Sequence, residues 1–381
     1  MPGLYIHIPY CRQACNYCNF HFSVSHKTRT DFIAALKKEF FLTKDFFPRS
    51  DNSFRIHLDT LYFGGGTPSI LTTEELADIL DTLNKYYDFD NHSEISIEAN
   101  PDDLTLVKAR EIKELGFNRL SIGIQSFFEE DLTYMNRLHN PAQAKESIVN
   151  SRNAGFENIT IDLIYGTPTL QDDNWLQNLE SAKNFDIPHI SAYALTIEEK
   201  TPLSVFIKKG ISKPVSDETS ARQFEIMLDW MEKNNYIHYE ISNFGKKDFF
   251  SRHNISYWTG EAYLGLGPSA HSFVPGKRFW NISNTNQYIE SIKTGTLPHE
   301  AETLSVSQQI NEYIMTSLRT IWGCNLQRIR DEFGETYYDL VKSSSNKFLS
   351  KGLLLLQDSH LTLTKKGKFL ADGIAADLFV D

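Results

Sequence analysis

Three of the four cysteines, Cys11, Cys15 and Cys18, lie within eight residues, in the spacing C-x₃-C-x₂-C. Three thiolates on one short loop can bind three corners of a cubane [4Fe–4S] cluster and leave the fourth iron open. That iron can chelate the amino and carboxylate groups of S-adenosylmethionine. An electron passed through the cluster then breaks the sulfonium S–C bond and releases a 5′-deoxyadenosyl radical.

Two other uses of these cysteines remain open. A zinc knuckle needs a fourth ligand, for which His7 or His21 is available, but structural zinc prefers paired C-x₂-C spacings. A redox pair at Cys15 and Cys18 leaves Cys11 without a role. A disulfide scaffold would use more cysteines and distribute them along the chain. The spacing therefore favours the iron–sulfur cluster.

Short apolar runs alternate with amphipathic stretches through the first two hundred residues. This pattern predicts six strands, over residues 4–8, 58–63, 94–99, 119–124, 159–164 and 189–194. It predicts helices over 30–43, 73–87, 105–115, 141–154 and 173–184, with an N-terminal cap at Thr72 or Thr73. Strands that alternate with helices imply a parallel sheet with right-handed crossovers. We predict an α/β fold, a partial (β/α)₆ barrel two units short of the closed (β/α)₈ form.

The unusual residues fall at the carboxyl ends of these predicted strands, where function gathers in such folds. The cysteine loop follows the first strand, and Gly64-Gly65-Gly66-Thr67-Pro68 follows the second. The remaining strands end near Glu98-Ala99-Asn100-Pro101, Gln125, Asp162 and Tyr193-Ala194. Stability alone does not explain such residues at the end of every strand.

The chain changes character after residue 200, and we predict three domains. The barrel covers 1–235, with a helix over 221–234, and an irregular, aromatic-rich linker covers 236–300 after a short strand at 239–241. For the segment 301–381 the sequence predicts three helices, a hairpin of 353–356 with 361–363, and a last helix. That order resembles a winged helix, for which we expect a structural or lid role.

Composition narrows the class of protein. The 381 residues are 41% hydrophobic and 23% charged, with a net charge of −11. Residues 301–381 hold nine lysines and arginines against ten acids, so we expect no nucleic-acid partner. No stretch approaches the apolar length of a membrane span, and the first residues lack a signal-peptide pattern. We expect a cytoplasmic location.

The run Tyr5-Ile6-His7-Ile8-Pro9, followed by a cysteine loop with Tyr17 between its last two thiolates, resembles the radical S-adenosylmethionine superfamily. Over nearly its whole length the chain resembles the group of the anaerobic coproporphyrinogen III oxidases and the related haem chaperones, HemW. The resemblance implies S-adenosylmethionine contacts from Tyr5, Tyr17, Gly65, Gly66, Thr67, Pro68, Glu98, Gln125, Arg137, Asp162 and Ala194. Plainer alternatives are a helix cap for Glu98 or Asp162 and a surface position for Arg137.

Two details separate the oxidases from the haem chaperones. The oxidase loop continues to a further cysteine, as C-x₃-C-x₂-C-x-C, and Phe20 stands at that place here. The run His253-Asn254-Ile255-Ser256-Tyr257-Trp258 resembles the chaperones' H-N-x-x-Y-W signature. Histidine is a natural axial ligand for haem iron, and Tyr257 and Trp258 could stack on the macrocycle. The alternative is a histidine packed in an aromatic loop.

These features lead to the hypothesis of a haem-trafficking protein. It would hold a [4Fe–4S] cluster and S-adenosylmethionine, bind haem and pass it to haem-requiring apoproteins. His271 is a further candidate for the second haem ligand, and Cys324 is expected to be a buried thiol, with haem ligation as its alternative. The identity of an electron donor, if S-adenosylmethionine is cleaved, and the existence of a peripheral membrane partner remain open.

The competing hypothesis is an oxygen-independent coproporphyrinogen III oxidase, in which a radical abstracts a hydrogen from each propionate and carbon dioxide leaves. A cluster-bearing nucleic-acid modifier is a third class, which the acidic balance disfavours.

Overall fold

Six parallel strands form the centre of the molecule, in a computed structural model that describes residues 2–48 and 55–381. They are β1 (Gly3–Ile8), β3 (Thr60–Gly65), β5 (Glu94–Ala99), β6 (Arg119–Gln125), β7 (Asn158–Tyr165) and β8 (His189–Ala194). Each pairs with the next along the chain, in parallel register. The predicted partial barrel is confirmed.

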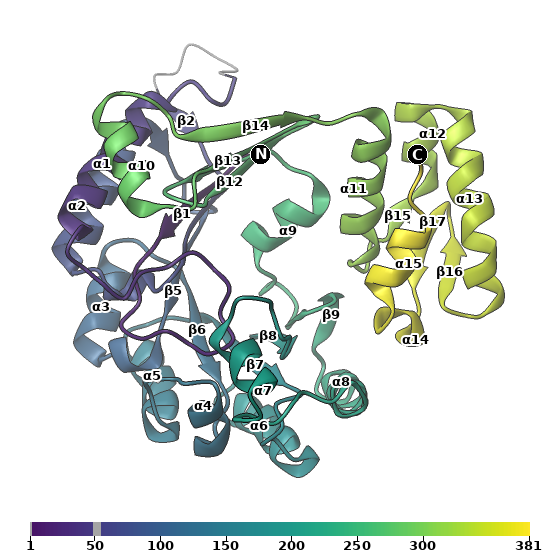
Figure 1. Cartoon of the computed structure of the whole chain (residues 1–381), viewed down its shortest axis with the longest axis horizontal. Coiled ribbons are helices and arrows are strands. Elements are labelled where there is room, and N and C mark those ends of the chain that lie inside the picture. The colour runs from purple at the N-terminus through teal and green to yellow at the C-terminus, as the bar shows by residue number, and fades with distance from the viewer. Residues whose placement is uncertain (1, 49–54) are drawn as a thin grey trace.

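Helices cover the outer face of these strands (Figure 1). They are α1 (Arg29–Leu42), α2 (Thr73–Leu83), α3 (Leu106–Glu114), α4 (Glu129–Tyr134), α5 (Pro141–Asn153) and α6 (Asp172–Asn184), with short 3₁₀ turns η1 (Pro68–Ile70) and η2 (Pro101–Asp103). The predicted cap is Thr72, which accepts a bond from the Glu75 amide while Glu75 bonds back, a capping box. The helix predicted to reach residue 87 ends at Leu83. The following residues form β4 (Tyr87–Asp88), which pairs with β2 (Ile56–His57).

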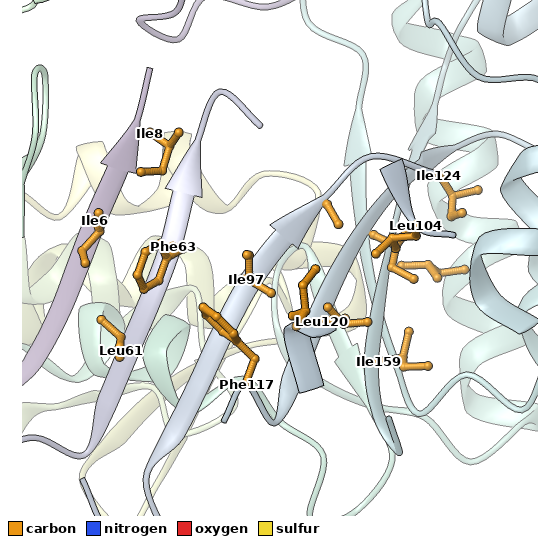
Figure 2. Close-up of a cluster of buried hydrophobic side chains, with 14 of the residues drawn as sticks. Ile6, Ile8, Leu61, Phe63, Ile97, Leu104, Phe117, Leu120, Ile124 and Ile159 are labelled. Carbon is orange, nitrogen blue, oxygen red and sulfur yellow. The ribbon is translucent and has the colours of Figure 1, made fainter. Parts of the chain in front are cut away.

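The alternation of side chains along β1 separates the core from the barrel interior. Leu4, Ile6 and Ile8 are fully buried, and they belong to the main hydrophobic cluster. Figure 2 shows Ile6 and Ile8 beside apolar side chains of neighbouring strands, among them Leu61, Phe63, Ile97 and Leu120. Full burial of each such side chain contributes about 1.5–3 kcal/mol. Tyr5 and His7, one residue out of phase, lie on the opposite face of the strand.

The prediction that residues 236–300, which follow the six barrel strands, form an irregular segment is wrong. Following α7 (Pro202–Lys208) and α8 (Asp217–Lys233), the chain forms β9 (Ile237–Glu240), β10 (Asn243–Gly245), α9 (Arg252–Thr259), β11 (Tyr263–Leu266), β12 (His271–Val274), β13 (Lys277–Asn281), α10 (Thr285–Lys293) and β14 (His299–Thr303). These strands extend both edges of the barrel into one sheet, in the order β14-β13-β12-β11-β1-β3-β5-β6-β7-β8-β10-β9. β11 pairs in parallel with β1, and β10 antiparallel with β8. The strands are short and mixed in polarity, so their sequence carries little periodic signal.

The C-terminal segment has a hydrophobic cluster of its own. It consists of α11 (Val306–Leu318), β15 (Cys324–Asn325), α12 (Leu326–Phe333), α13 (Glu335–Ser350), β16 (Leu354–Gln357), β17 (His360–Leu363), α14 (Lys365–Lys368) and α15 (Ala371–Asp377). The order matches the predicted winged-helix-like arrangement, with β15 added as a third strand beside the hairpin. Within 2–48 and 55–381, no helix combines the length and apolar character needed to cross a membrane. The boundaries at 235 and 300 stay a prediction.

Candidate functional site

A cavity of about 420 Å³ opens at the carboxyl ends of the barrel strands. Twelve of the predicted site residues line it: Cys11, Cys15, Cys18, Tyr17, Gly65, Gly66, Thr67, Glu98, Gln125, Arg137, Asp162 and Ala194. Two predicted contacts lie outside this lining. The Tyr5 hydroxyl contacts His7 Nδ1 at 3.2 Å, and Pro68 is buried at the start of η1.

The cysteine loop is held at its start by the glycine loop after β3. The Gly66 amide donates to the Ile8 carbonyl at 2.8 Å, and the Thr67 amide donates to the Tyr10 carbonyl at 2.8 Å. A Cβ at Gly66 would lie 2.7 Å from the Tyr10 carbonyl oxygen, so only glycine permits this approach. The two loops predicted from separate motifs therefore form one structure.

Side chains donate hydrogen bonds to the thiols of Cys11 and Cys15, and the Phe20 backbone donates one to the thiol of Cys18. The Thr67 hydroxyl donates to Cys11 Sγ at 3.5 Å, and Arg137 Nη1 donates to Cys15 Sγ at 3.3 Å. Burial raises the pKa of the Cys11 thiol to about 11, an effect that the Thr67 bond opposes. Donors aimed at sulfur are the outer contacts that iron–sulfur thiolates use.

A single metal ion and a cubane cluster place different demands on the three thiols. Among the described residues, no three histidine, cysteine or acidic side chains converge on one metal-ion position. A zinc knuckle requires such convergence, whereas a cubane takes each thiolate on a different iron.

Arg137 carries a donor that no protein group uses. Its Nη2 donates to Asn100 Oδ1 at 2.7 Å and to the Gly123 carbonyl at 2.9 Å, while its Nε is buried without a partner. A buried orphan donor in a cavity wall suits an anionic ligand group, such as the carboxylate of an amino acid. The plain alternative of a surface arginine is wrong, because these contacts hold the side chain in the wall of the cavity.

Two carboxyl groups face the same cavity. Glu98 accepts from the Tyr62 hydroxyl at 2.9 Å and from the Gly65 amide at 3.1 Å, so it does not act as a helix cap. Burial, followed by the charge of Asp162, raises the pKa of Glu98 to about 8. Burial likewise raises the pKa of Asp162 to about 6. A cationic ligand group beside them would favour their ionised forms.

Large apolar and aromatic side chains contribute to the opening of this cavity. Phe20 is 69% exposed and lines the cavity together with Leu138 and Tyr193, which are about half exposed. Gln125 lines the wall at the end of β6. Its backbone has a positive φ of 64°, a conformation that residues other than glycine rarely adopt. The opening of the cavity therefore carries apolar side chains beside exposed polar ones, such as Asn19 and Glu198.

The H-N-x-x-Y-W run lies elsewhere, on α9, near the amino ends of the strands. His253 is fully buried, with Nδ1 2.8 Å from Thr60 Oγ1 and Nε2 2.7 Å from the Tyr257 hydroxyl. Its ring stacks on Tyr62 with centroids 5.0 Å apart, and burial lowers its pKa to about 3. Ligation of an iron by His253 therefore requires that one of these two hydrogen bonds opens.

Other elements fix the two ends of α9. The Glu94 carboxylate accepts from the Arg252 and His253 amides at 3.0 and 3.1 Å. At the other end, the Arg319 guanidinium lies 5.1 Å from the centre of the Trp258 ring, which is a cation–π contact. Arg319 directly follows α11. The buried Trp258 Nε1 has no partner.

The two further haem-ligand candidates differ in exposure. His271 is exposed at the start of β12, and its ring stacks on Trp280. Cys324 is fully buried in the C-terminal hydrophobic cluster, as predicted for a structural thiol. Burial raises the pKa of this thiol to about 12.

Some residues of the cavity were not predicted as site residues. Ser121 on β6 donates to Asp162 Oδ1 at 3.4 Å, and Asn100 contacts both Thr67 and Arg137. Asn100 stands at a predicted strand end, so its position was a usable signal. A serine inside a buried strand gives no such signal.

Comparisons with known proteins agree with this geometry. Residues 5–182 match the family model described as the radical SAM superfamily, and residues 304–370 match the HemN C-terminal domain. The chain is 33% identical to the heme chaperone HemW of Bacillus subtilis over 98% of each chain. It is 31% identical to radical S-adenosyl methionine domain-containing protein 1, mitochondrial, of Danio rerio, over 100% of this chain and 87% of the relative.

Among solved structures, the coproporphyrinogen III oxidase HemN of Escherichia coli superposes with a TM-score of 0.84. The match covers 100% of this chain and 90% of the oxidase, at 21% identity, and so establishes the shared fold. Because the similarity to the HemW relatives extends over nearly the full length of both chains, this protein belongs to the radical SAM superfamily and, within it, to the family of those relatives.

Proposed function

We propose that this protein is a haem chaperone, which binds a [4Fe–4S] cluster, S-adenosylmethionine and haem and delivers the haem to apoproteins. The observation that carries the proposal is the 33% identity, over 98% of both chains, to a relative named heme chaperone HemW. Further relatives with the same name match at 30–31% identity over most of this chain.

The residues at the cavity suit the first two cofactors. Cys11, Cys15 and Cys18 would hold the cluster, with Thr67 and Arg137 as donors to two of the sulfurs. Bound together, the two cofactors supply reductive cleavage of the sulfonium bond. The orphan Nε of Arg137 suits the methionine carboxylate, and Glu98 and Asp162 suit its cationic groups.

Phe20 is the local feature that favours a chaperone over an oxidase. It occupies the place of the further cysteine of the oxidase loop, and its side chain is 69% exposed beside the cavity. An exposed phenyl ring offers stacking to a macrocycle but no thiol chemistry. The fold shared with the oxidase does not decide between the two activities.

For haem we propose contacts from the motif on α9, with His253 as the iron ligand and Tyr257 and Trp258 against the macrocycle. The Tyr257 hydroxyl lies 2.7 Å from His253 Nε2. Haem binding would replace this hydrogen bond with an iron–nitrogen bond, so the proposal includes a movement of Tyr257.

The test is a haem titration of the anaerobically reconstituted protein, compared with His253→Ala. His189→Ala is a matched control, because His189 is equally buried and its Nε2 lies 2.8 Å from a tyrosine hydroxyl, that of Tyr239. We expect a near one-to-one Soret change in the wild type and the control, and its loss in His253→Ala.

Two results would contradict parts of the proposal. Equal binding by both variants would remove His253 as the ligand and leave the chaperone function standing. Absence of binding by the wild type, together with turnover of coproporphyrinogen III by the reconstituted protein, would replace the chaperone function with the oxidase. Haem transfer is measured separately, with apomyoglobin as the acceptor.

A further inference from the structure

Asn100 connects the two side-chain hydrogen-bond donors that reach the cysteine sulfurs. It follows β5, at the carboxyl edge of the sheet, and its side-chain amide lies between Thr67 and Arg137. Thr67 follows β3 and Arg137 follows α4, so three separate chain segments meet at this amide. No motif of the sequence assigns a role to this residue.

The amide orients the Thr67 hydroxyl. Asn100 Nδ2 donates to Thr67 Oγ1 at 3.3 Å and so occupies an acceptor position of that oxygen. A hydroxyl group has one proton, and the Cys11 sulfur, at 3.5 Å, is its acceptor. Thr67 is 4% exposed, which leaves little room for water to take that proton instead.

The same amide orients the Arg137 guanidinium. Asn100 Oδ1 accepts from Arg137 Nη2 at 2.7 Å, and the Gly123 carbonyl accepts from the same nitrogen at 2.9 Å. Because a guanidinium is planar, these two bonds also fix the direction of Nη1, which lies 3.3 Å from Cys15 Sγ. A Cβ at Gly123 would lie 3.2 Å from Arg137 Nη2, so a glycine there leaves space for this pairing.

The orientation of the amide follows from its partners. Reversal of its oxygen and nitrogen would set an NH₂ group against the guanidinium, which has only donors. The backbone of Asn100 is held by other contacts. Its backbone N–H donates to Ser69 Oγ at 3.2 Å, and its backbone carbonyl accepts from the Asp103 N–H at 3.1 Å. Asn100 thus has one orientation in which every bond is made.

We propose that Asn100 is a positioning residue for the iron–sulfur site, which aims one donor at the Cys11 sulfur and another at the Cys15 sulfur. The inference rests on the cluster of the proposed function. Reduction adds negative charge to the cluster and its sulfurs, so donors to sulfur stabilise the reduced state and raise the reduction potential. Asn100 sets that potential without contacting a sulfur itself.

The experiment is a redox titration of the reconstituted full chain, followed by electron paramagnetic resonance, with iron content measured in parallel. We expect Asn100→Ala to retain its iron and to show a reduction potential shifted to more negative values. The matched control is Asn118→Ala. The side-chain amide of Asn118 likewise makes two hydrogen bonds, since its Oδ1 accepts from the Ile95 amide and its Nδ2 donates to the Ser93 carbonyl, both at the opposite end of β5. The control should keep the wild-type potential.

A double-mutant cycle tests the route of the effect. Thr67→Val removes the donor to Cys11 outright, so part of the Asn100→Ala shift should be absent when Thr67 is already replaced. We expect the double variant to shift less than the sum of the two single shifts. Additive shifts would overturn the coupling through Thr67.

The remaining outcomes are also decisive. If Asn100→Ala retains its iron at the wild-type potential, the inference is wrong. If Asn100→Ala holds no iron, the decision passes to Thr67→Val, and a wild-type potential there overturns the inference. A wild-type chain that reconstitutes no cluster contradicts the proposed function itself, whereas a normal wild type beside unshifted variants contradicts only the role of Asn100.

Discussion

The two ends of the barrel interior use similar polar residues in different ways. At the carboxyl end, Arg137 has a buried Nε without a partner, and the raised pKa of Glu98 reflects a carboxyl group held in the cavity wall. At the amino end, both terminal nitrogens of Arg119 donate to protein oxygens, and both ring nitrogens of His253 have partners. The buried orphan donor of Arg137 leaves a place for a ligand at the carboxyl end, whereas the paired terminal nitrogens of Arg119 connect neighbouring strands of the barrel at the amino end.

The largest expected effect is loss of the cluster. Replacement of Cys11, Cys15 and Cys18 by alanine should abolish the iron-dependent absorption after anaerobic reconstitution, because the carboxyl end loses all its predicted iron ligands. Cys324→Ala is the control, since its thiol is buried in the C-terminal cluster. Iron and sulfide analysis checks the result, and an iron content in the triple variant equal to that of the wild type would refute the cysteine assignment.

The two arginines give the sharpest test of the comparison between the ends. Arg119→Met removes the cation from a fully buried network that includes Glu94 at 3.9 Å, and should lower the free energy of unfolding by about 3–5 kcal/mol. Urea unfolding measures this loss. The affinity of the remaining folded protein for S-adenosylmethionine should stay at the wild-type level.

For Arg137→Met we expect the reverse: the affinity for S-adenosylmethionine should fall more than the free energy of unfolding does. Loss of a charged donor to the ligand should weaken S-adenosylmethionine binding by roughly 10- to 100-fold, about 1.5–3 kcal/mol. Isothermal titration calorimetry on the reconstituted protein measures the affinity. If Arg137→Met proves the less stable variant and Arg119→Met the weaker binder, the distinction between the two ends fails.

The smallest effect is a pH dependence from the amino end. Burial lowers the pKa of His253 from 6.5 to about 3, so below pH 6.5 the unfolded chain binds a proton that the folded chain does not. The unfolded state then binds more protons, and the free energy of unfolding falls as the pH falls, by about 1.4 kcal/mol per pH unit for this residue. His253→Gln should therefore lose less stability than the wild type between pH 6 and pH 5 in urea titrations. Parallel pH curves for the two proteins would contradict the burial of a neutral imidazole.

The sequence predicted the parts of the fold whose signals are local and periodic. The six barrel strands are such parts, because each is an apolar run between helices and pairs with its neighbour along the chain. β11 escaped prediction because it is four residues long and its partner, β1, lies more than 250 residues away in sequence. The position of α9 was not predicted either, because the strands around that helix determine where it lies.

The site divides in the same way. The cysteines and the glycine loop were predictable, because each motif lies within a few consecutive residues whose types and spacing indicate its chemistry. The position of Asn100 at a strand end was predictable too, but its link between Thr67 and Arg137 was not, since those two residues approach it from other segments. The burial of His253 between Thr60 and Tyr257 likewise depends on a long-range contact.

The pairing of β1 with β11 has a consequence for the time at which the protein becomes complete. β1 carries the cysteine loop, and it lies between β3, which ends at Gly65, and β11, which begins at Tyr263. Ribosomes add about 5–20 residues per second, so β11 follows β3 after an interval on the order of 10–40 s. Until then one edge of β1 is an open template for other strands. The nascent chain therefore carries its cysteines on an unfinished sheet, and the frame of the cluster site closes only late in synthesis.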